Sequence, residues 1–263
     1  MNPEEANLAL SKALASLDLL LMKEAIQEGA DVNSITTVKI FGFRKEQNNV
    51  TALTAAVLNF FYYDTPIDFI EALLKAGANP NLGHLKDDYR TEYPLHSMMY
   101  INSSLLSSVK NYREILVGME QVAKLLIGHG ADPSIAHTDG RTFLHNLMIP
   151  LKVTKVQWAC SFELLIPFLR KMVNMKNALG NNVVAELGLG ANLWGNTKDP
   201  ILVCQALIDM GAEFSAEGSR NNNGKSFEEV MIQRELTSVW RAILPNVAVK
   251  HNLSEGVVAR PRL

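Results

Sequence analysis

Cysteine is scarce in this chain. Only two occur among its 263 residues, Cys160 and Cys204, and each lies in an apolar segment with no metal-ligand spacing around it. We therefore expect two buried free thiols in a reducing compartment. A cysteine hydrolase is not predicted, because neither segment has the glycine-rich turn that would expose an activated sulfur.

The chain also lacks a charge excess and a long hydrophobic run. Its 25 Lys and Arg residues face 27 Asp and Glu residues, for a net charge of -2, so there is no basic field for nucleic acid or anionic lipid. The apolar run 17–22 is far shorter than the ~20 residues that span a bilayer. Glu4 and Glu5 stand where an export signal would carry basic residues. We expect a cytoplasmic protein with no nucleic-acid partner and no membrane insertion.

Motifs for phosphate or metal binding are missing as well. The run 188–190 (GLG) has no third glycine, no following Lys-Ser/Thr and no strand before it. His129, His137 and His145 recur at intervals of eight, but that interval crosses a helix end and a turn, so the side chains need not converge. The sequence thus predicts no catalytic residue, no cofactor and no metal site.

What the chain does contain is a repeating junction, clearest in residues 124–145 (KLLIGHGADPSIAHTDGRTFLH). An apolar helix end is followed by Gly130, which takes readily the positive φ that ends a helix. Gly140 suits the following turn, and the Thr142 hydroxyl can cap a new helix. Gly-Ala pairs of this kind recur at 29–30, 77–78, 130–131 and 211–212.

This junction resembles the ankyrin repeat, a β-turn and two helices with a T-P-L-H-x-A opening. The openings at 93–96 (YPLH) and 142–145 (TFLH) carry the resemblance best. It implies an all-α fold, an ankyrin-repeat solenoid of about six helix-pair units with β-turn fingers, one extended hairpin finger and elongated helices. The expected repeat domain covers 1–245, followed by a C-terminal tail at 246–263. Its units are expected near 8–33, 51–81, 93–134, 142–174, 182–215 and 226–245.

The expected units are longer than the family norm. Leu53 and Leu95, at equivalent positions, are 42 residues apart, against about 33 in the family. Apolar residues in 101–119 have helical spacing, which predicts extra helical turns. The segment 36–44 is rich in β-branched and aromatic residues, which predicts an extended β-hairpin. A milder extension lies at 82–92.

Several polar residues of the pattern are expected to have structural roles. In ankyrin repeats the histidine of T-P-L-H hydrogen-bonds across neighbouring turns, so the resemblance implies this role for His96 and His145. Thr51, Thr142 and Ser226 are expected to cap helices, and Ser226 also opens the spacing of a capping box.

The resemblance implies a function too. Ankyrin stacks bind on a concave surface lined by the fingers and first helices, so we expect a monomeric, non-catalytic scaffold or adaptor that binds a protein partner. Aromatic and arginine side chains dominate interface energy, which favours the first two fingers. The candidate contact residues are Phe41, Phe43 and Arg44 on the first finger, Lys86, Tyr89 and Arg90 on the second, Asp139 and Arg141 on the third, and Asn181 and Asn182 on the fourth.

Other interpretations stay open at this point. Phe41 and Phe43 have an alternative role, as core that covers the second unit. Long ankyrin repeats joined to no other domain also resemble effectors that intracellular bacteria deliver into host cells, which would make the basic tail a translocation signal. One alternative function is an enzyme with an unrecognised site in the degenerate fourth and fifth units. The other is a self-associating structural protein that uses the insert 101–119.

Overall fold

The structure, a computed structural model, describes residues 1–38, 48–87, 90–98, 112–148, 159, 162–189 and 198–254. The chain divides into two compact units, unit 1 (Met1–Asp139) and unit 2 (Gly140–Leu263). Helices dominate both units, and the described strands all lie in unit 1. Each unit is built from helix pairs, as the sequence predicts.

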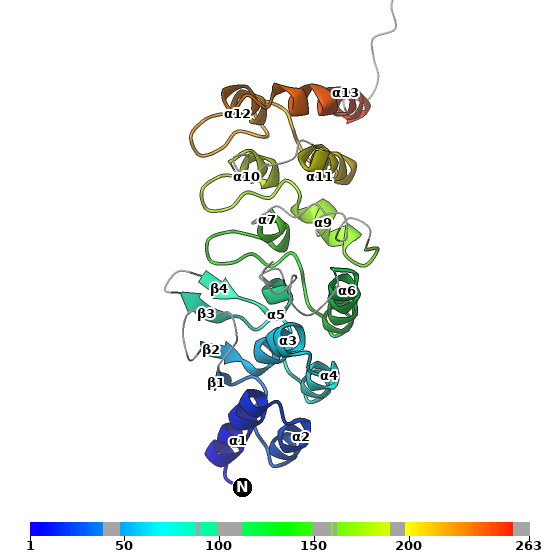
Figure 1. Ribbon diagram of the computed structural model, residues 1–263. Coiled ribbons are helices and arrows are strands. Elements are labelled where there is room, and N and C mark those ends of the chain that lie inside the picture. Colours follow the sequence, from blue (N-terminus) through cyan, green and yellow to red (C-terminus); the bar gives the residue numbers. More distant parts are fainter. Residues whose placement is uncertain are drawn as a thin grey trace, which may run out of the picture. The chain divides into compact units, whose positions relative to one another are not determined.

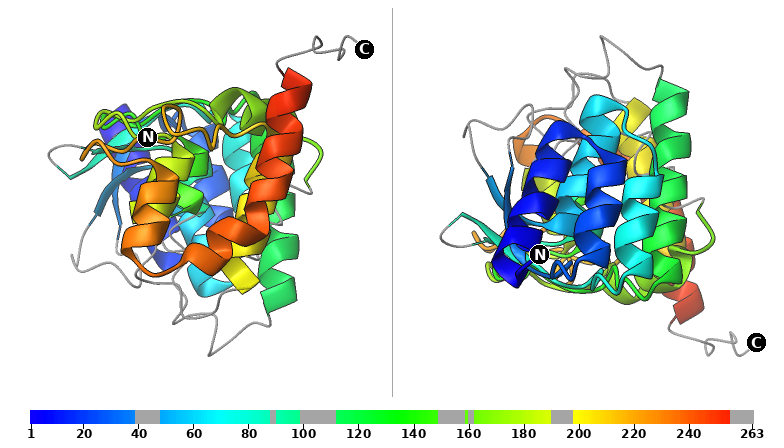
Figure 2. Two further views of the ribbon diagram at one scale, coloured as in Figure 1. Left: turned by 90° about the horizontal axis from the view of Figure 1, so that it is seen from above. Right: turned by 90° about the horizontal axis from the view of Figure 1, so that it is seen from below.

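Unit 1 arranges its helices in two rows (Figure 1). These helices are α1 (Pro3–Ser16), α2 (Leu19–Gln27), α3 (Ala52–Tyr63), α4 (Asp68–Lys75), α5 (Pro94–Ser97) and α6 (Tyr112–Gly128). In the first row α3 contacts both α1 and α5, and in the second row α4 contacts both α2 and α6. The pairs α1–α2 and α3–α4 contact each other across the rows, so one apolar core runs between them. Seen from below, the longer helices of unit 1 lie side by side (Figure 2).

The first helix pair shows why the sequence folds in this way. Asn2 accepts a hydrogen bond from the Glu5 backbone N–H at 2.8 Å, and Glu5 accepts one from the Asn2 N–H at 3.0 Å, which together form a capping box. Leu17 ends α1 with a φ of 58°, and the Asp18 side chain caps α2. The chain turns between Ser16 and Leu19, and α1 begins at Pro3, ahead of the start expected near residue 8. Its buried face consists of Ala6, Leu10, Ala13 and Leu14.

Two β-hairpins connect the helix pairs of unit 1. Strand β1 (Ile35–Val38) pairs antiparallel with β2 (Asn48–Thr51). Strand β3 (His84–Asp87) pairs antiparallel with β4 (Arg90–Glu92), with a register shift after Leu85. Strand β2 contacts β3, and both hairpins stand beside the row of α1 and α3 (Figure 1). A hairpin is confirmed at the predicted place: 36–38 lie in β1, and the rest of the predicted segment, 39–44, lies outside the described residues. The second extension forms a hairpin that the sequence did not predict.

The glycines that end the second helices behave as predicted. Gly29, Gly77, Gly130 and Gly211 all have φ between 91° and 95°. Each turn closes with a hydrogen bond from the following alanine N–H back into its own helix, as in Ala78 N to Leu73 O at 2.9 Å. This geometry is a common helix ending, and it gives each pair the same exit direction.

An asparagine near the base of several fingers ties one repeat to the glycine turn of the next. Asn81 donates from Nδ2 to Gly130 O at 2.8 Å and accepts from Asp132 N at 2.8 Å. No local sequence pattern predicts this clamp, because Asn81 and its partners are about fifty positions apart in the chain. The same pair of bonds joins Asn33 to Gly77 O and Asn79 N, and Asn174 to Gly211 O and Glu213 N.

We expect Asn81→Ala to lower the free energy of unfolding of unit 1 by about 2 kcal/mol, since two hydrogen bonds of ordinary worth are lost. Asn81→Asp keeps the acceptor for Asp132 N but places a carboxylate oxygen against Gly130 O, so it should cost at least as much as Asn81→Ala. Urea unfolding followed by tyrosine fluorescence measures unit 1, because all six tyrosines precede residue 140. Equal stability of Asn81→Ala and the native chain would contradict the clamp.

Unit 2 repeats the two-row arrangement. Its described helices are α7 (Phe143–Leu147), α9 (Ile166–Met172), α10 (Val183–Leu189), α11 (Lys198–Met210), α12 (Phe227–Gln233) and α13 (Thr237–Ser254). In one row α10 contacts α7 and α12, and in the other α11 contacts α9 and α13. The predicted capping box at α12 is confirmed, because Ser226 Oγ accepts from Glu229 N and the Glu229 carboxylate accepts from Ser226 N.

The C-terminal helix crosses the domain boundary that the sequence predicts. Helix α13 contains Pro245 and continues to Ser254, past the domain end expected at residue 245. A proline inside a helix removes one backbone N–H and its ring crowds the carbonyl four residues earlier, so Pro245 costs α13 about 3 kcal/mol or more. Of the predicted helical insert 101–119, residues 112–119 lie in α6 and the remainder lies outside the described residues.

Candidate functional site

The two hairpins of unit 1 form a surface that we call the hairpin face (35–38, 48–51, 84–87 and 90–92). Side chains alternate on its strands. Thr36 and His84 are 2% and 6% exposed, whereas their neighbours Ile35 and Leu85 are 53% and 69% exposed. In β1 and β3, therefore, one side chain is buried against the protein and its neighbour presents aliphatic surface to solvent.

Hydrogen bonds anchor both hairpins to the helices and to the next finger. The Thr36 hydroxyl bonds to the Ser11 hydroxyl of α1. In the second hairpin, His137 Nδ1 donates to Thr91 O, and His137 Nε2 lies 3.0 Å from His96 Nδ1. The Tyr93 ring meets the His96 ring edge-on, with centroids 5.4 Å apart. These contacts hold β4 against α5 and the third finger.

The predicted structural role of the two T-P-L-H histidines is confirmed. The T-P-L-H histidines His96 and His145 are 1% and 0% exposed. His96 pairs with His137 of the third finger, which is 3% exposed. Burial and the neighbouring His137 lower the pKa of His96 to about 3, so the His96 ring is neutral at physiological pH. In unit 2, His145 donates from Nε2 to Asn181 O in the next finger at 3.2 Å.

The predicted contact residues have different positions in the structure. Lys86 lies in β3 and Arg90 begins β4, so both belong to the hairpin face. Asp139 and Arg141 are half-buried in the third finger. Four of the candidates lie outside the described residues and stay predictions: Phe41, Phe43, Arg44 and Tyr89.

Asn181 and Asn182 have a different role from the one predicted. They are 0% and 1% exposed, so their side chains offer no surface to a partner. Asn182 accepts from Ala185 N as a cap of α10 and donates to Gly218 O. Asn181 accepts from Asn222 N at 2.7 Å. Short amides at a finger base reach the backbone of the next finger, and this internal bracing replaces the expected partner contact.

Sequence reasoning missed Ile35 and Leu85, the exposed aliphatic residues of the hairpin face. Ile35 precedes the segment 36–44, which predicts a hairpin. Leu85 lies in the extension 82–92, whose charged residues do not favour a strand. Period-two alternation would have separated them from their buried neighbours once both strands were assigned.

One of the two cysteines lies among the described residues. Cys204 is fully buried in α11, and burial raises the pKa of its thiol far above the usual range, so it is a poor nucleophile. Cys160 lies outside the described residues. Within the described ranges, no group of three or more His, Cys, Asp and Glu side chains is arranged to hold a metal ion. None of the described helices combines the length and apolar character that a membrane span requires.

Comparison by sequence finds no matching family model and no matching curated protein. Comparison of structures finds ankyrin folds. An ankyrin repeat domain from Acinetobacter baumannii is 18% identical with a TM-score of 0.56, over 90% of this chain and 96% of that one. The ankyrin repeat protein EF0377 is 18% identical with a TM-score of 0.57, again over 90% and 96%.

A third similar structure is a chain from the complex of Bd0816, a predatory endopeptidase from Bdellovibrio bacteriovorus, with the immunity protein Bd3460. It is 19% identical with a TM-score of 0.55, over 90% of this chain and 97% of that one. Identities this low establish the fold alone. The chain has the ankyrin-repeat fold, and the all-α fold class predicted from the sequence is confirmed.

Proposed function

We propose that this protein is a non-catalytic scaffold that binds a partner protein through the hairpin face of unit 1. The observation that carries the proposal is the outward exposure of Ile35 and Leu85 on two neighbouring, lengthened hairpins. Ordinary ankyrin fingers are β-turns, so each hairpin adds surface that folding of the helix pairs does not require.

The energetics favour these two residues as contacts. Burial of a Leu or Ile side chain that was exposed stabilises a complex by about 1.5–3 kcal/mol. The hairpins are anchored before binding by Thr36 and His137, so little further ordering of their strands is needed. Lys86 follows Leu85 in β3 and Arg90 begins β4, so the sequence of the second hairpin includes basic residues that suit acidic residues on the partner.

The finger tips belong to the same proposal. Phe41, Phe43 and Arg44 follow β1 in the sequence and would extend the contact beyond its strands. Asp139 is a further candidate in unit 1, and Arg141 stays a separate prediction for unit 2. One of the similar structures comes from a complex of two proteins, which agrees with a protein partner for this fold.

The experiment is affinity capture with three matched forms of the full chain, followed by mass spectrometry. The native chain is compared with Ile35→Ser/Leu85→Ser and with Leu20→Ser, a control on α2 that is 67% exposed and away from the hairpins. We expect a partner that the native chain and Leu20→Ser both retain and that the double variant loses. Equal recovery by all three forms would overturn the hairpin face as the binding site.

The choice of lysate tests the finer role. A bacterial and a eukaryotic lysate are used in parallel, because an adaptor of the bacterial cytoplasm requires a bacterial partner and an effector requires a host partner. Recovery from the eukaryotic lysate alone would support delivery into a host cell, and recovery from the bacterial lysate alone would contradict it.

A further inference from the structure

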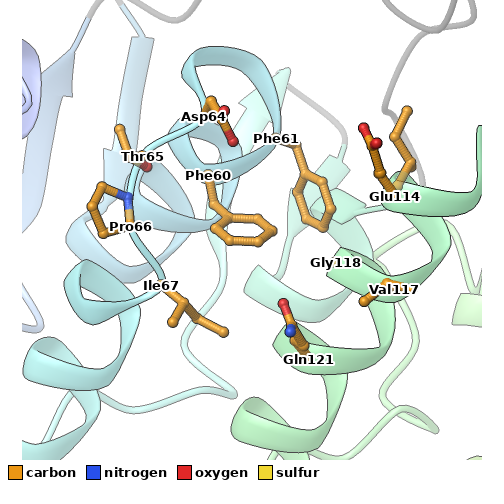
Figure 3. Close-up of a pocket in the computed structure, with 11 residues that line it drawn as sticks. Phe60, Phe61, Asp64, Thr65, Pro66, Ile67, Glu114, Val117, Gly118 and Gln121 are labelled. Carbon is orange, nitrogen blue, oxygen red and sulfur yellow. The ribbon is translucent and has the colours of Figure 1, made fainter. Parts of the chain in front are cut away.

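Unit 1 contains a pocket at the last turn of α3 (Figure 3). Its volume is about 650 Å³, within the range of about 300–1,000 Å³ that is typical of small-molecule sites. It lies between the last turn of α3, the α3–α4 connection and α6. Because α3 begins at Ala52, directly after β2, the first lining residue, Phe60, lies about 12 Å along that helix from the hairpin.

The apolar wall of the pocket depends on a glycine inside α6. A Cβ added at Gly118 would lie 3.0 Å from Phe60 Cε1 and 3.6 Å from Phe61 Cε1. Glycine inside a helix costs about 1 kcal/mol relative to alanine. Because Gly118 has no side chain, both rings can lie against the α6 backbone. The two rings are edge-to-face with centroids 5.0 Å apart.

The wall is open to solvent. Phe60 and Phe61 are half-buried, and Val117 beside them is 50% exposed. Figure 3 shows the two rings between the α3–α4 connection and the α6 backbone. An apolar group of a ligand can therefore reach aromatic and aliphatic surface without rearrangement of the helices.

A buried hydroxyl in the pocket wall has no hydrogen-bond partner. Thr65 is 5% exposed, and its Oγ1 makes no hydrogen bond. A buried polar group in this state costs about 1–3 kcal/mol. A ligand with an N–H or O–H group at this position would remove that cost, so the hydroxyl favours a polar ligand group next to the apolar wall.

The charged residues of the lining favour one sign of charge on the ligand's polar group. Asp64 adjoins Thr65 in the α3–α4 connection, and Glu114 faces the pocket from the first turn of α6. The described lining residues include no Lys, Arg or His. Two carboxylates beside an apolar wall favour a cation and disfavour an anion.

We propose that this pocket binds a small organic cation with an aromatic or branched apolar body and a protonated amine. The body packs against Phe60, Phe61 and Val117. The ammonium group donates to Thr65 Oγ1 and lies near the Asp64 and Glu114 carboxylates. This site is separate from the hairpin face, so the chain has two binding surfaces within unit 1.

The test uses calorimetric titration of the full chain with 2-(naphthalen-2-yl)ethylamine at pH 7. The matched neutral probe is 2-(naphthalen-2-yl)ethanol, which has the same apolar body. We expect the amine to bind about tenfold more tightly than the alcohol, the contribution of one favourable charge interaction. Equal affinity for the two probes, or no binding of the amine, would overturn the proposal.

Two variants place the amine in this pocket. Gly118→Leu fills the space before the phenyl rings and should abolish binding of both probes, with unchanged helical content by circular dichroism. Asp64→Asn/Glu114→Gln alters two exposed side chains. It should lower the affinity for the amine to that for the alcohol. Glu24→Gln, on an exposed position of α2, is the control and should change nothing. Unchanged amine binding by the double variant would overturn the charge selection.

Discussion

Replacement of Gly140 by alanine is expected to lower the free energy of unfolding of unit 2 by about 3 kcal/mol. Gly140 has a φ of 74°, and a Cβ there would lie 2.6 Å from Ala178 N and 2.9 Å from Asn177 C. The left-handed conformation costs a non-glycine residue about 1–2 kcal/mol. Overpacking against backbone that cannot yield adds about 1–3 kcal/mol.

The control is Gly180→Ala, at the corresponding turn of the next finger. Gly180 has a φ of 80°, and its Cβ would meet nothing within 4 Å, so only the conformational cost of about 1 kcal/mol remains. All three tryptophans follow residue 140, so tryptophan fluorescence during urea unfolding reports on unit 2. Equal losses for the two variants would show that the close approach of the third and fourth fingers does not contribute.

Unit 1 is expected to lose about 2 kcal/mol of stability when the pH falls from 6.5 to 5.0. The pKa of His96 is lowered to about 3 in the folded chain, against about 6.5 in an unfolded chain. Below pH 6.5 the unfolded chain therefore binds a proton that the folded chain does not. The free energy of unfolding then falls by about 1.4 kcal/mol per pH unit until the folded pKa is reached.

Tyrosine fluorescence during urea unfolding at several pH values measures this slope for unit 1. His96→Asn should be less stable at pH 7 but should have a flatter dependence between pH 6.5 and 5.0. His129→Asn changes an exposed histidine of the same unit and should retain the native slope. Parallel pH dependences for the native chain and His96→Asn would contradict the role of the buried His96–His137 pair.

Local patterns in the sequence predicted most of the fold. The Gly-Ala pairs marked helix ends because a positive φ is a property of single residues. The capping box at Ser226 was predicted because its two residues are three positions apart. The first hairpin was predicted because its residues favour strands, whereas Lys86 and Asp87 in the second hairpin do not.

Contacts between distant residues could not be predicted in this way. Asn81 and Asn181 resemble finger-tip residues in the sequence, and only the stacking of neighbouring fingers turns them into internal clamps. The pocket beside Gly118 needs Phe60 at the end of another helix, and no periodic pattern relates these two positions. Candidate sites at finger tips were therefore partly misplaced, while the choice of the first two fingers stays a prediction.

The central claim, binding of a partner protein through the hairpin face, is tested most directly by calorimetric titration of the captured partner into purified forms of the chain. We expect Ile35→Ser/Leu85→Ser to weaken binding and to raise the dissociation constant at least about tenfold, since each substitution removes apolar burial. Leu20→Ser should stay within about twofold of the native value, because it removes similar exposed apolar surface elsewhere. Matching affinities for the double variant and Leu20→Ser would contradict the hairpin face as the site of recognition.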